Sequence, residues 1–576
     1  MIDTTFIQLK KNAKSFDKSE AKAKLVLMGD CATQHLATSI KGYSVYNGYP
    51  IEVIDIDYNL IDAQILDDSS ELYTENPDFV LIFQCTEKLE QAFYECSNKS
   101  QFAEEVYNKI EKNWIRIGSK IKSKILQFTF TENDNKVFGN YALKTTESFL
   151  YQVKKLNLLL ADGCQKNKNV FLVDLNAIQN EYGKNILKDS KLYYVAKMPI
   201  SLELLPVVAK NVIDIISAIS GIVKKCIICD LDNTLWGGVI GDDGLNGIQI
   251  GELGVGHAFE DLQRWLKSLK ERGIILAVCS KNEENNAREP FEKHPEMVLT
   301  LDDISIFVAN WEDKASNIRY IQRTLNIGMD SMVFLDDNPF ERNLVKSMIP
   351  EITVPDLPED PALYLDYLKS LNLFETASYS ATDQDRTKQY KAEVDRIETE
   401  KLFESYDDYL NSLEMVADVC EFDEFQTPRI AQLTQRSNQF NLRTVRCTEG
   451  DIANYIKDNN YITRYYMLRD KFGDHGLISV LLLKKTDKDT LFIENWLMSC
   501  RVLKRGMEEF IADSIVQIAK ENGFKYVIGE YLQTPKNAMV ANLYEKLGFI
   551  SVGDNLFKVD VDKYIQHKTY INKKEV

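Results

Sequence analysis

The sequence predicts a multidomain α/β protein. Its 576 residues exceed the length at which a single hydrophobic core stops growing, so several domains are expected. Short apolar runs first alternate with helical patterns, which indicates parallel sheets covered by helices. Towards the end, β-rich runs follow one another closely, which indicates antiparallel strands. We expect an α/β domain over residues 1–220, a second α/β domain over 221–357, a charged helical connector over 358–412 and an α+β domain over 413–576.

The first segment contains a series of short apolar runs that are typical of buried strands. The patterns of Ala103–Ile117 and Glu147–Leu160 between them predict helices. Strands that alternate with helices form a parallel sheet. The predicted strands are Leu25–Met28, Ile51–Asp57, Phe79–Gln84, Ile125–Thr131 and Val170–Leu175.

The second segment opens with a strand that ends in two aspartates. Cys226–Cys229 is an unbroken apolar run, so Asp230 and Asp232 lie at its carboxyl end, where open α/β sheets place their ligands. Asp230 can attack phosphorus there. Asp232, two residues later, can protonate the leaving oxygen and then deprotonate water. The alternative is a surface turn that caps a helix.

Three later segments contain the other parts of a phosphoryl-transfer site. Ser280 ends a second apolar strand and can donate a hydrogen bond to a phosphoryl oxygen, and Lys314 can neutralise charge on that group. Asp336 and Asp337 end a third strand. Carboxylate oxygens are the ligands that Mg²⁺ prefers. The expected metal ligands are Asp230, Asp232, Asp336 and Asp337.

The order D-x-D-x-T, S, K and DD resembles the haloacid dehalogenase (HAD) superfamily, whose domain is Rossmann-like. About fifty residues separate Asp232 from Ser280 and about thirty separate Ser280 from Lys314, which leaves no room for a folded cap over the site. We therefore expect a capless phosphatase-like domain. Its open crevice can admit a large, protein-borne substrate.

The turn Gly29–Thr33 after the first strand resembles the nucleophile turn of SGNH hydrolases, which have a flavodoxin-type α/β fold. Cys31 stands where that family has serine, and Lys188–Lys191 contains no histidine in place of the family's D-x-x-H motif. A thiol at a helix N-terminus gains thiolate character, so Cys31 is either an acyl nucleophile or a buried remnant. His35, one turn later, is more typical of a structural residue. We favour a role in binding or recruitment.

The last segment resembles the GNAT acyltransferase fold, in which a loop of pattern [QR]-x-x-G-x-[GA] binds the pyrophosphate of coenzyme A. Here the resemblance implies a cofactor loop containing Arg501, Arg505 and Gly506, but Lys504 replaces the first glycine and puts coenzyme A in doubt. Tyr544 matches the tyrosine that protonates a leaving thiolate, with a packed helical aromatic as the alternative. His475 is either a base or part of a structural turn.

The order of these parts, with the motifs DLDNTLWGGVIGDDG, VCSKN, FLDDNPFER and SCRVLKRG, resembles the FkbH-like proteins over nearly the whole chain. The resemblance implies an enzyme that removes phosphate from a phosphorylated small-molecule donor such as 1,3-bisphosphoglycerate. It also implies that the glyceryl group is transferred to the thiol of an acyl carrier protein. Cys279 immediately precedes Ser280, so we expect its thiol, near Lys314 and Mg²⁺, to accept the glyceryl group. Alternation along the strand would instead point Cys279 into the core.

Composition limits the classes of partner. A formal net charge of −18 and a pI near 5.0, with no basic stretch, argue against nucleic acid. Cys226 and Cys229 lie within an apolar strand and no second pair has ligand spacing, so zinc is not expected. The absence of a signal peptide, lipidation motif or apolar run of transmembrane length predicts a cytoplasmic protein without membrane insertion.

Two other functions stay open. A plain Mg²⁺-dependent phosphatase would act on a sugar phosphate or phosphoprotein and use the terminal domains for recruitment. A coenzyme A-dependent acyltransferase of surface glycan biosynthesis would instead use the GNAT-like domain.

Overall fold

The computed structural model describes residues 4–379, 389–392, 396, 399, 403 and 405–574. The chain divides into two compact units, Met1–Ser217 and Ala218–Val576. The described strands form a five-stranded, a four-stranded and an eight-stranded sheet, which confirms the multidomain α/β class. Within the predicted charged helical connector, most of the run of alternating charges from Asp383 to Lys401 lies outside the described residues.

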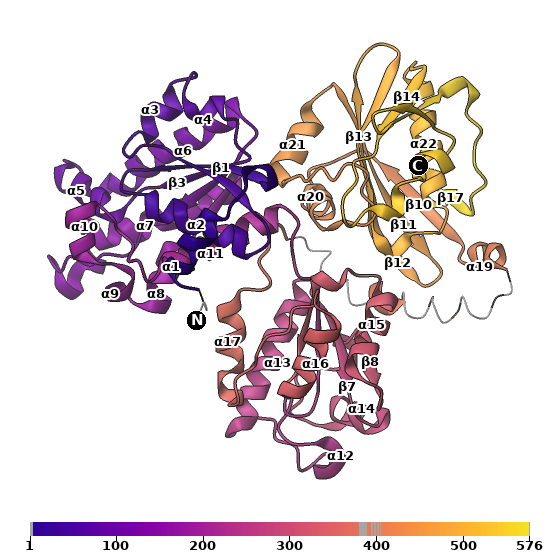
Figure 1. Cartoon of the computed structure of the whole chain (residues 1–576), viewed down its shortest axis with the longest axis horizontal. Coiled ribbons are helices and arrows are strands. Elements are labelled where there is room, and N and C mark those ends of the chain that lie inside the picture. Colours follow the sequence, from indigo (N-terminus) through magenta and orange to yellow (C-terminus); the bar gives the residue numbers. More distant parts are fainter. Residues whose placement is uncertain are drawn as a thin grey trace. The chain divides into compact units, whose positions relative to one another are not determined.

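The first unit contains a parallel five-stranded sheet with the order β2-β1-β3-β4-β5, which is the flavodoxin-type order. Helices lie on both sides of this sheet (Figure 1). The strands are β1 (Ala23–Gly29), β2 (Ile51–Asp55), β3 (Phe79–Phe83), β4 (Lys124–Phe128) and β5 (Val170–Val173). The helices are α1 (Phe6–Lys14), α2 (Gln34–Tyr46), α3 (Ile61–Leu66), α4 (Glu71–Thr74), α5 (Thr86–Glu95), α6 (Phe102–Lys120), α7 (Phe149–Lys166), α8 (Leu175–Tyr182), α9 (Lys184–Leu187), α10 (Ser190–Ala196) and α11 (Leu205–Ile219).

The second unit begins with a parallel four-stranded sheet of order β8-β7-β6-β9. Its central strands are continuous apolar runs because helices cover both faces. The strands are β6 (Cys226–Cys229), β7 (Ile275–Ser280), β8 (Ile306–Ala309) and β9 (Met332–Leu335). The helices are α12 (Ile240–Asp243), α13 (Val255–Glu271), α14 (Glu284–Lys293), α15 (Lys314–Leu325), α16 (Pro339–Met348) and α17 (Tyr364–Leu371).

Side chains alternate between two cores on the two faces of this sheet. Ile227 and Cys229 pack with residues of α13, whereas Cys226 and Ile228 pack with residues of α15 and α16. The residue that follows each strand therefore leaves the sheet at its carboxyl edge, where both cores end. Between β6 and α13 the chain forms only α12, of four residues, so the described segment contains no folded cap.

The end of the chain forms an eight-stranded sheet of order β15-β16-β14-β13-β12-β11-β10-β17. Strands β10 to β13 are antiparallel neighbours, and α22 then connects β13 to the parallel strand β14. This mixed sheet confirms the predicted α+β, GNAT-like class. The strands are β10 (Met415–Cys420), β11 (Tyr461–Asp470), β12 (Gly473–Lys485), β13 (Thr490–Met498), β14 (Tyr526–Glu530), β15 (Ile550–Gly553), β16 (Leu556–Asp560) and β17 (Ile571–Lys573). The helices are α19 (Tyr406–Ser412), α20 (Thr427–Arg436), α21 (Glu449–Lys457), α22 (Met507–Glu521) and α23 (Leu543–Lys546).

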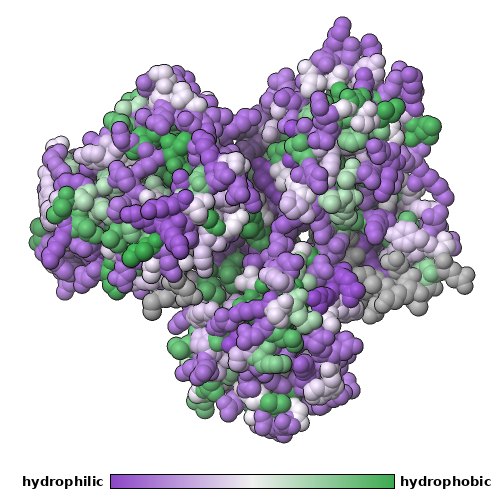
Figure 2. Space-filling model, in the orientation of Figure 1, coloured by the Kyte–Doolittle hydropathy of each residue, from purple (hydrophilic) through white to green (hydrophobic). Residues whose placement is uncertain are grey.

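Hydrophobic and hydrophilic residues are mixed on the face of the molecule drawn in Figure 2. On the face drawn in Figure 2, hydrophobic residues form small groups among hydrophilic ones, as is usual for folded proteins. Among the described residues, no helix is both long and apolar enough to span a bilayer.

Candidate active site

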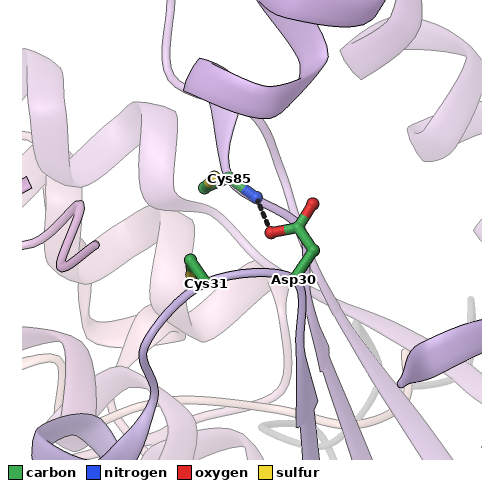
Figure 3. A group of neighbouring side chains, drawn as sticks. All are labelled: Asp30, Cys31 and Cys85. Atoms are coloured by element: carbon green, nitrogen blue, oxygen red, sulfur yellow. Dashed lines mark hydrogen bonds between the residues drawn. The ribbon is translucent and has the colours of Figure 1, made fainter. Parts of the chain in front are cut away.

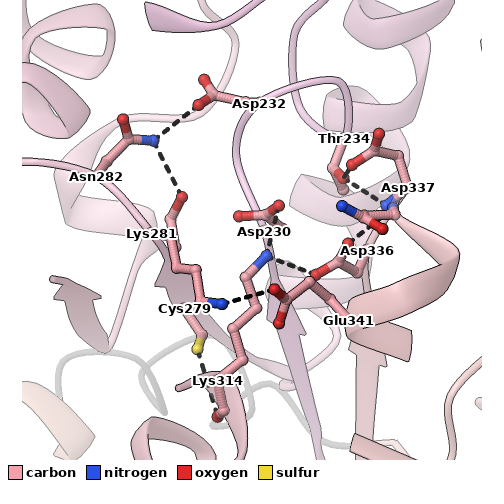
Figure 4. Close-up of polar contacts among 12 residues, drawn as sticks. Asp230, Asp232, Thr234, Cys279, Lys281, Asn282, Lys314, Asp336, Asp337 and Glu341 are labelled. Carbon is pink, nitrogen blue, oxygen red and sulfur yellow. Dashed lines mark hydrogen bonds and ion pairs between the residues drawn. The ribbon is translucent and has the colours of Figure 1, made fainter. Parts of the chain in front are cut away.

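Acidic and hydroxyl side chains gather where β6, β7 and β9 end. Asp230 follows β6, Ser280 ends β7, and Asp336 and Asp337 follow β9. Because these strands are parallel and adjacent, their carboxyl ends meet at one edge of the sheet. Figure 4 shows the resulting group of side chains. The structure thus brings three of the four predicted segments to one edge of the sheet. Lys314, from the fourth segment, contacts Asp230 and Asp336 there.

Lys314 is the first residue of α15 and is 3% exposed. Its Nζ atom lies 2.7 Å from Asp230 Oδ2 and 2.6 Å from Asp336 Oδ2. Burial alone would lower the pKa of Lys314, but the two carboxylates outweigh it and raise the pKa. The lysine is therefore a fixed positive charge between two carboxylates.

One lysine does not neutralise the acidic groups around it. Burial, together with the charge of Asp230, raises the pKa of Asp336 to about 7 despite the contact with Lys314. Asp337 has a raised pKa for the same two reasons. Excess negative charge in a buried place is costly unless a cation is present.

An unpartnered oxygen points to where that cation would be held. Asp230 Oδ1 is buried and accepts no hydrogen bond, although its sister oxygen contacts Lys314. Carboxylate oxygens of Asp230, Asp336 and Asp337 all lie within 4.8 Å of one another. This all-oxygen set suits a hard divalent ion such as Mg²⁺. The residues therefore fit the metal that the sequence predicts.

Asp232 does not join this set of three. Its Oδ1 accepts hydrogen bonds from Trp236 Nε1 and from the backbone N–H of Ile240, both at 3.0 Å, and its Oδ2 accepts one from Asn282 Nδ2 at 2.9 Å. The structure thus departs from the prediction that the Asp232 carboxylate is a metal ligand, because three donors turn it elsewhere. A position in the first turn after β6 still leaves it available for proton transfer.

Asn282 is a site residue that the sequence analysis did not identify. Its side chain is 4% exposed, and its Nδ2 donates to Ser280 Oγ at 3.2 Å as well as to Asp232. The amide therefore links the ends of two segments, and its place in the VCSKN motif is the sequence signal that could have identified it. Thr234 and Arg342 support the other side, because Thr234 Oγ1 accepts the backbone N–H of Asp337 at 3.1 Å and Arg342 Nη1 donates to the Asp336 carbonyl at 2.9 Å.

Cys279 lies away from the acidic group. Its side chain is fully buried on the sheet face covered by α15, and Sγ donates to the Lys314 carbonyl at 3.9 Å. Burial raises the pKa of the Cys279 thiol well above its usual value, with Lys314 only partly opposing this. The prediction of a nucleophilic Cys279 does not agree with this position. Alternation along β7 turns the side chain into the core instead.

Tyr544, predicted as an acid, is buried among aromatic residues. It is 1% exposed, its ring stacks on Phe557 at 5.3 Å, and its hydroxyl has no hydrogen-bond partner in the described chain. A Cβ atom on Gly529 would lie 2.2 Å from the Tyr544 ring, so the glycine makes room for it. Tyr544 is therefore a packed helical aromatic, which was the alternative to a catalytic acid. Burial raises the pKa of its hydroxyl and separates it from solvent.

One arginine of the predicted cofactor loop points towards the protein interior. Arg505 is 4% exposed, and its Nη1 lies 3.2 Å from His475 Nε2 and 3.6 Å from Asp470 Oδ2. Gly506, with φ of +82°, is the N-cap of α22. The side chain of Arg501 lies outside the described residues. The expectation that Arg505 faces a cofactor is therefore not met.

His475 should make this part of the protein sensitive to acid. Burial, with the nearby Arg396 and Arg505, lowers its pKa to about 4 from 6.5, although Asp470 opposes the shift. The native state thus favours neutral His475, and its contribution to stability is present above pH 6.5 and lost as pH falls towards 4. We expect the free energy of opening of β12 to fall by up to about 1.4 kcal/mol per pH unit in that window. Hydrogen exchange of β12 amides, corrected for intrinsic rates, measures it.

The matched variant is His475→Gln, which keeps a polar side chain but cannot titrate. It should flatten the dependence between pH 6.5 and 4. The same slope in both proteins would show that another group titrates. Asp470 falls outside this window because its pKa is lowered below its usual value of 3.8.

The first unit has a separate group, Asp30, Cys31 and Cys85, at the ends of β1 and β3 (Figure 3). Asp30 Oδ1 accepts the backbone N–H of Cys85 at 2.8 Å. Cys31 is 1% exposed, and its contact with Cys85 and its burial raise the pKa of its thiol. His35 stacks on Phe6 at 5.1 Å and does not contact this group. These features fit a buried remnant better than a thiolate nucleophile.

Comparison with known proteins gives matches for both units. Residues 24–217 match the family described as FkbH, N-terminal domain. A solved structure from Bacteroides fragilis, the N-terminal part of a protein containing a phosphatase domain complexed with Mg, is 48% identical. The alignment covers 65% of this chain and 100% of that chain, with a TM-score of 0.62. No curated protein matches the chain.

Solved acetyltransferases also align with about a quarter of the chain. A ribosomal-protein-S18-alanine N-acetyltransferase from Escherichia coli is 14% identical, covering 25% of this chain and 94% of its own, with a TM-score of 0.21. A spermidine/spermine N-acetyltransferase from Vibrio cholerae is 11% identical, covering 26% and 95%, with a TM-score of 0.21.

Proposed function

Because this chain belongs to the FkbH-like family, we propose that it is a Mg²⁺-dependent phosphoryl-transfer enzyme with Asp230 as its nucleophile. One observation carries the proposal: Asp230 has one oxygen on Lys314 and a second, buried oxygen without a partner, beside Asp336 and Asp337. The Mg found in the Bacteroides fragilis relative supports the choice of ion. Asp230, Asp336 and Asp337 would hold it, and it would supply positive charge for the phosphoryl oxygens.

The chemistry follows from the positions of two aspartates. An oxygen of Asp230 attacks phosphorus, the bond from phosphorus to the leaving oxygen breaks, and Asp232 gives that oxygen a proton. Asp232 then takes a proton from water, which attacks the aspartyl phosphate. The bond from phosphorus to Asp230 breaks, so inorganic phosphate leaves and the carboxylate is restored. Lys314 and Ser280 stabilise charge on the phosphoryl oxygens.

The metal requirement can be tested at Asp337. Asp337→Asn removes one anionic ligand but keeps the side chain's shape and leaves the Asp230–Lys314–Asp336 contacts in place. We expect the Mg²⁺ concentration for half-maximal phosphate release to rise by on the order of 10–100-fold. A Mg²⁺ titration of the rate measures it.

The control is Asp366→Asn on the exposed side of α17, which should leave the Mg²⁺ titration unchanged. Equal Mg²⁺ dependence in the Asp337 variant and the native chain would remove Asp337 from the metal site.

The finer proposal concerns the substrate. We propose that the donor is an acyl phosphate that also carries a phosphate ester, such as 1,3-bisphosphoglycerate, and that the glyceryl group passes to the phosphopantetheine thiol of an acyl carrier protein. The short segment between β6 and α13 supports this, since an uncapped site can admit a carrier-borne arm.

Two different bonds must break in this reaction. Attack of Asp230 at the acyl phosphate phosphorus would release a free acid and lose the activated acyl group. The aspartate chemistry is therefore assigned to the phosphate ester. The carrier thiolate attacks the carbonyl carbon, a carbon–sulfur bond forms, and the carbon–oxygen bond breaks to release phosphate. The buried position of Cys279 supports direct transfer to the carrier thiol.

Intact-mass analysis of a carrier protein tests the finer proposal. The full chain, Mg²⁺, the carrier and 1,3-bisphosphoglycerate should give a carrier mass increase equal to one glyceryl group. Asp230→Asn should leave the carrier adduct one phosphate heavier, because thiol attack does not need the aspartate. Phosphate release without any carrier adduct would support a plain phosphatase. An acetyl adduct formed from acetyl-coenzyme A would favour the acyltransferase alternative.

A further inference from the structure

We infer that the loop before α22 is closed to the pyrophosphate of coenzyme A, and that Glu508 of the same chain is the residue that closes it. The inference concerns the eight-stranded domain and does not depend on the phosphatase chemistry. It rests on how Lys504, Arg505 and Glu508 are placed where the GNAT fold holds its cofactor.

The backbone at Lys504 has the conformation that a glycine would adopt. Its φ is +64°, in the left-handed region that favours glycine, and Gly506 follows with φ of +82°. The loop therefore has the backbone conformation of a glycine-containing loop. It carries a lysine side chain at the position where the backbone must approach phosphate closely. The hydroxyl of Tyr406 in α19 donates to the Lys504 carbonyl at 2.7 Å and ties the loop in place.

A carboxyl group already occupies one of the loop's backbone hydrogen-bond donors. Glu508 Oε1 accepts the backbone N–H of Lys504 at 3.0 Å, so this N–H faces a negative group from its own chain. The other oxygen, Oε2, is buried without a hydrogen-bond partner in the described chain, which places the carboxyl group inside the loop rather than in solvent. Burial also raises the pKa of the Glu508 carboxyl. A helix N-terminus favours negative charge, and here Glu508 and Glu509 lie in the first turn of α22.

The arginine next to Lys504 in the loop points away from an incoming phosphate. Arg505 is buried against His475 and Asp470, and its guanidinium is committed to that cluster. A pyrophosphate entering the loop would have to displace Glu508 from the Lys504 N–H and remain beside two glutamates. The phosphates and the two glutamates would carry like charges and repel, so the loop selects against a nucleoside diphosphate.

A loop closed to pyrophosphate limits which acyl donors the eight-stranded domain can use. Any acyl group it handles must arrive on a carrier without the nucleotide half of coenzyme A. An acetyl-coenzyme A-dependent acyltransferase is therefore excluded by the chain's own loop, although the sheet around it is of the acyltransferase type.

Titration calorimetry of the full chain with coenzyme A tests the inference. The native protein should show no saturable binding up to about 1 mM ligand. The double variant Lys504→Gly/Glu508→Gln restores the glycine and removes the charge. It should bind at least about tenfold more tightly than the native chain. The matched control, Glu521→Gln at the other end of α22, should behave as the native chain.

Titration with adenosine 3′,5′-bisphosphate, which lacks the pyrophosphate, separates the loop from any contact with the adenosine. Tight binding of coenzyme A to the native chain would overturn the closed loop. Failure of the folded double variant, verified by an unchanged circular dichroism spectrum, to gain affinity would overturn the role of Glu508.

Discussion

Asp230→Asn is expected to lower phosphate release by at least about 10³-fold, because an amide oxygen is a far weaker nucleophile than a carboxylate. The change keeps the size of a side chain that is only 7% exposed, so the loss reports on chemistry rather than on packing. The measurement is inorganic phosphate released per enzyme at saturating Mg²⁺. Without a carrier protein, hydrolysis of the phosphate ester of 1,3-bisphosphoglycerate and of a generic aryl phosphate should both show the loss.

The same variant should not be less stable in the absence of Mg²⁺. Asp230 and Asp336 share one lysine, and burial with the neighbouring charge raises the pKa of Asp336 to about 7. Removing one of two buried negative charges relieves that repulsion. Thermal unfolding with and without Mg²⁺ tests this, and Asp366→Asn is again the control. Undiminished turnover of every phosphorylated compound by Asp230→Asn would remove Asp230 from the reaction.

Lys314→Ala is expected to damage both stability and activity. The substitution leaves Asp230 and Asp336 buried without their common positive partner, and breaking such a pair costs about 3–5 kcal/mol. Phosphate release should fall by about 10²–10³-fold, because a fixed positive charge beside the phosphoryl group is lost. Urea unfolding without Mg²⁺ and steady-state rates with Mg²⁺ measure the two effects.

Two control variants separate charge from packing. Lys314→Met keeps most of the apolar stem, so a loss of stability shared by both variants comes from the missing charge. Lys293→Ala removes an exposed lysine that pairs with Glu289 on α14, and it should change stability by less than about 0.5 kcal/mol. If Lys314→Ala unfolded like the native chain, the carboxylates would not depend on this lysine.

Much of the central domain could be predicted because its strands are buried on both faces. Cys226–Cys229 and Met332–Leu335 are unbroken apolar runs followed at once by aspartates, and they form β6 and β9 as expected. Strand β8, Ile306–Ala309, was not predicted, because four residues give too little pattern to distinguish a strand from a loop. Its importance comes only from pairing with β7 at the sheet edge.

The errors at single residues concern the direction in which side chains point. Cys279 and Ser280 are neighbours in sequence, yet alternation along β7 turns the first side chain into the α15 core and leaves the second near Asn282. Arg505 lies in a predicted loop, but a buried acid and histidine attract its guanidinium inward. The direction of the Arg505 side chain is decided by partners that are remote in sequence, whereas that of Cys279 follows from the local alternation of the strand.

The sequence by itself determined which chemical groups end the parallel strands, because the apolar runs and the acidic, hydroxyl and basic residues that follow them are local features. Only the tertiary structure decided which of these groups meet. Lys314 reaches Asp230 and Asp336 because β6, β9 and α15 pack together, while Asp232 is turned aside by Trp236 and Asn282. Contacts between distant segments depend on strand order and packing, and neither is encoded in a local pattern.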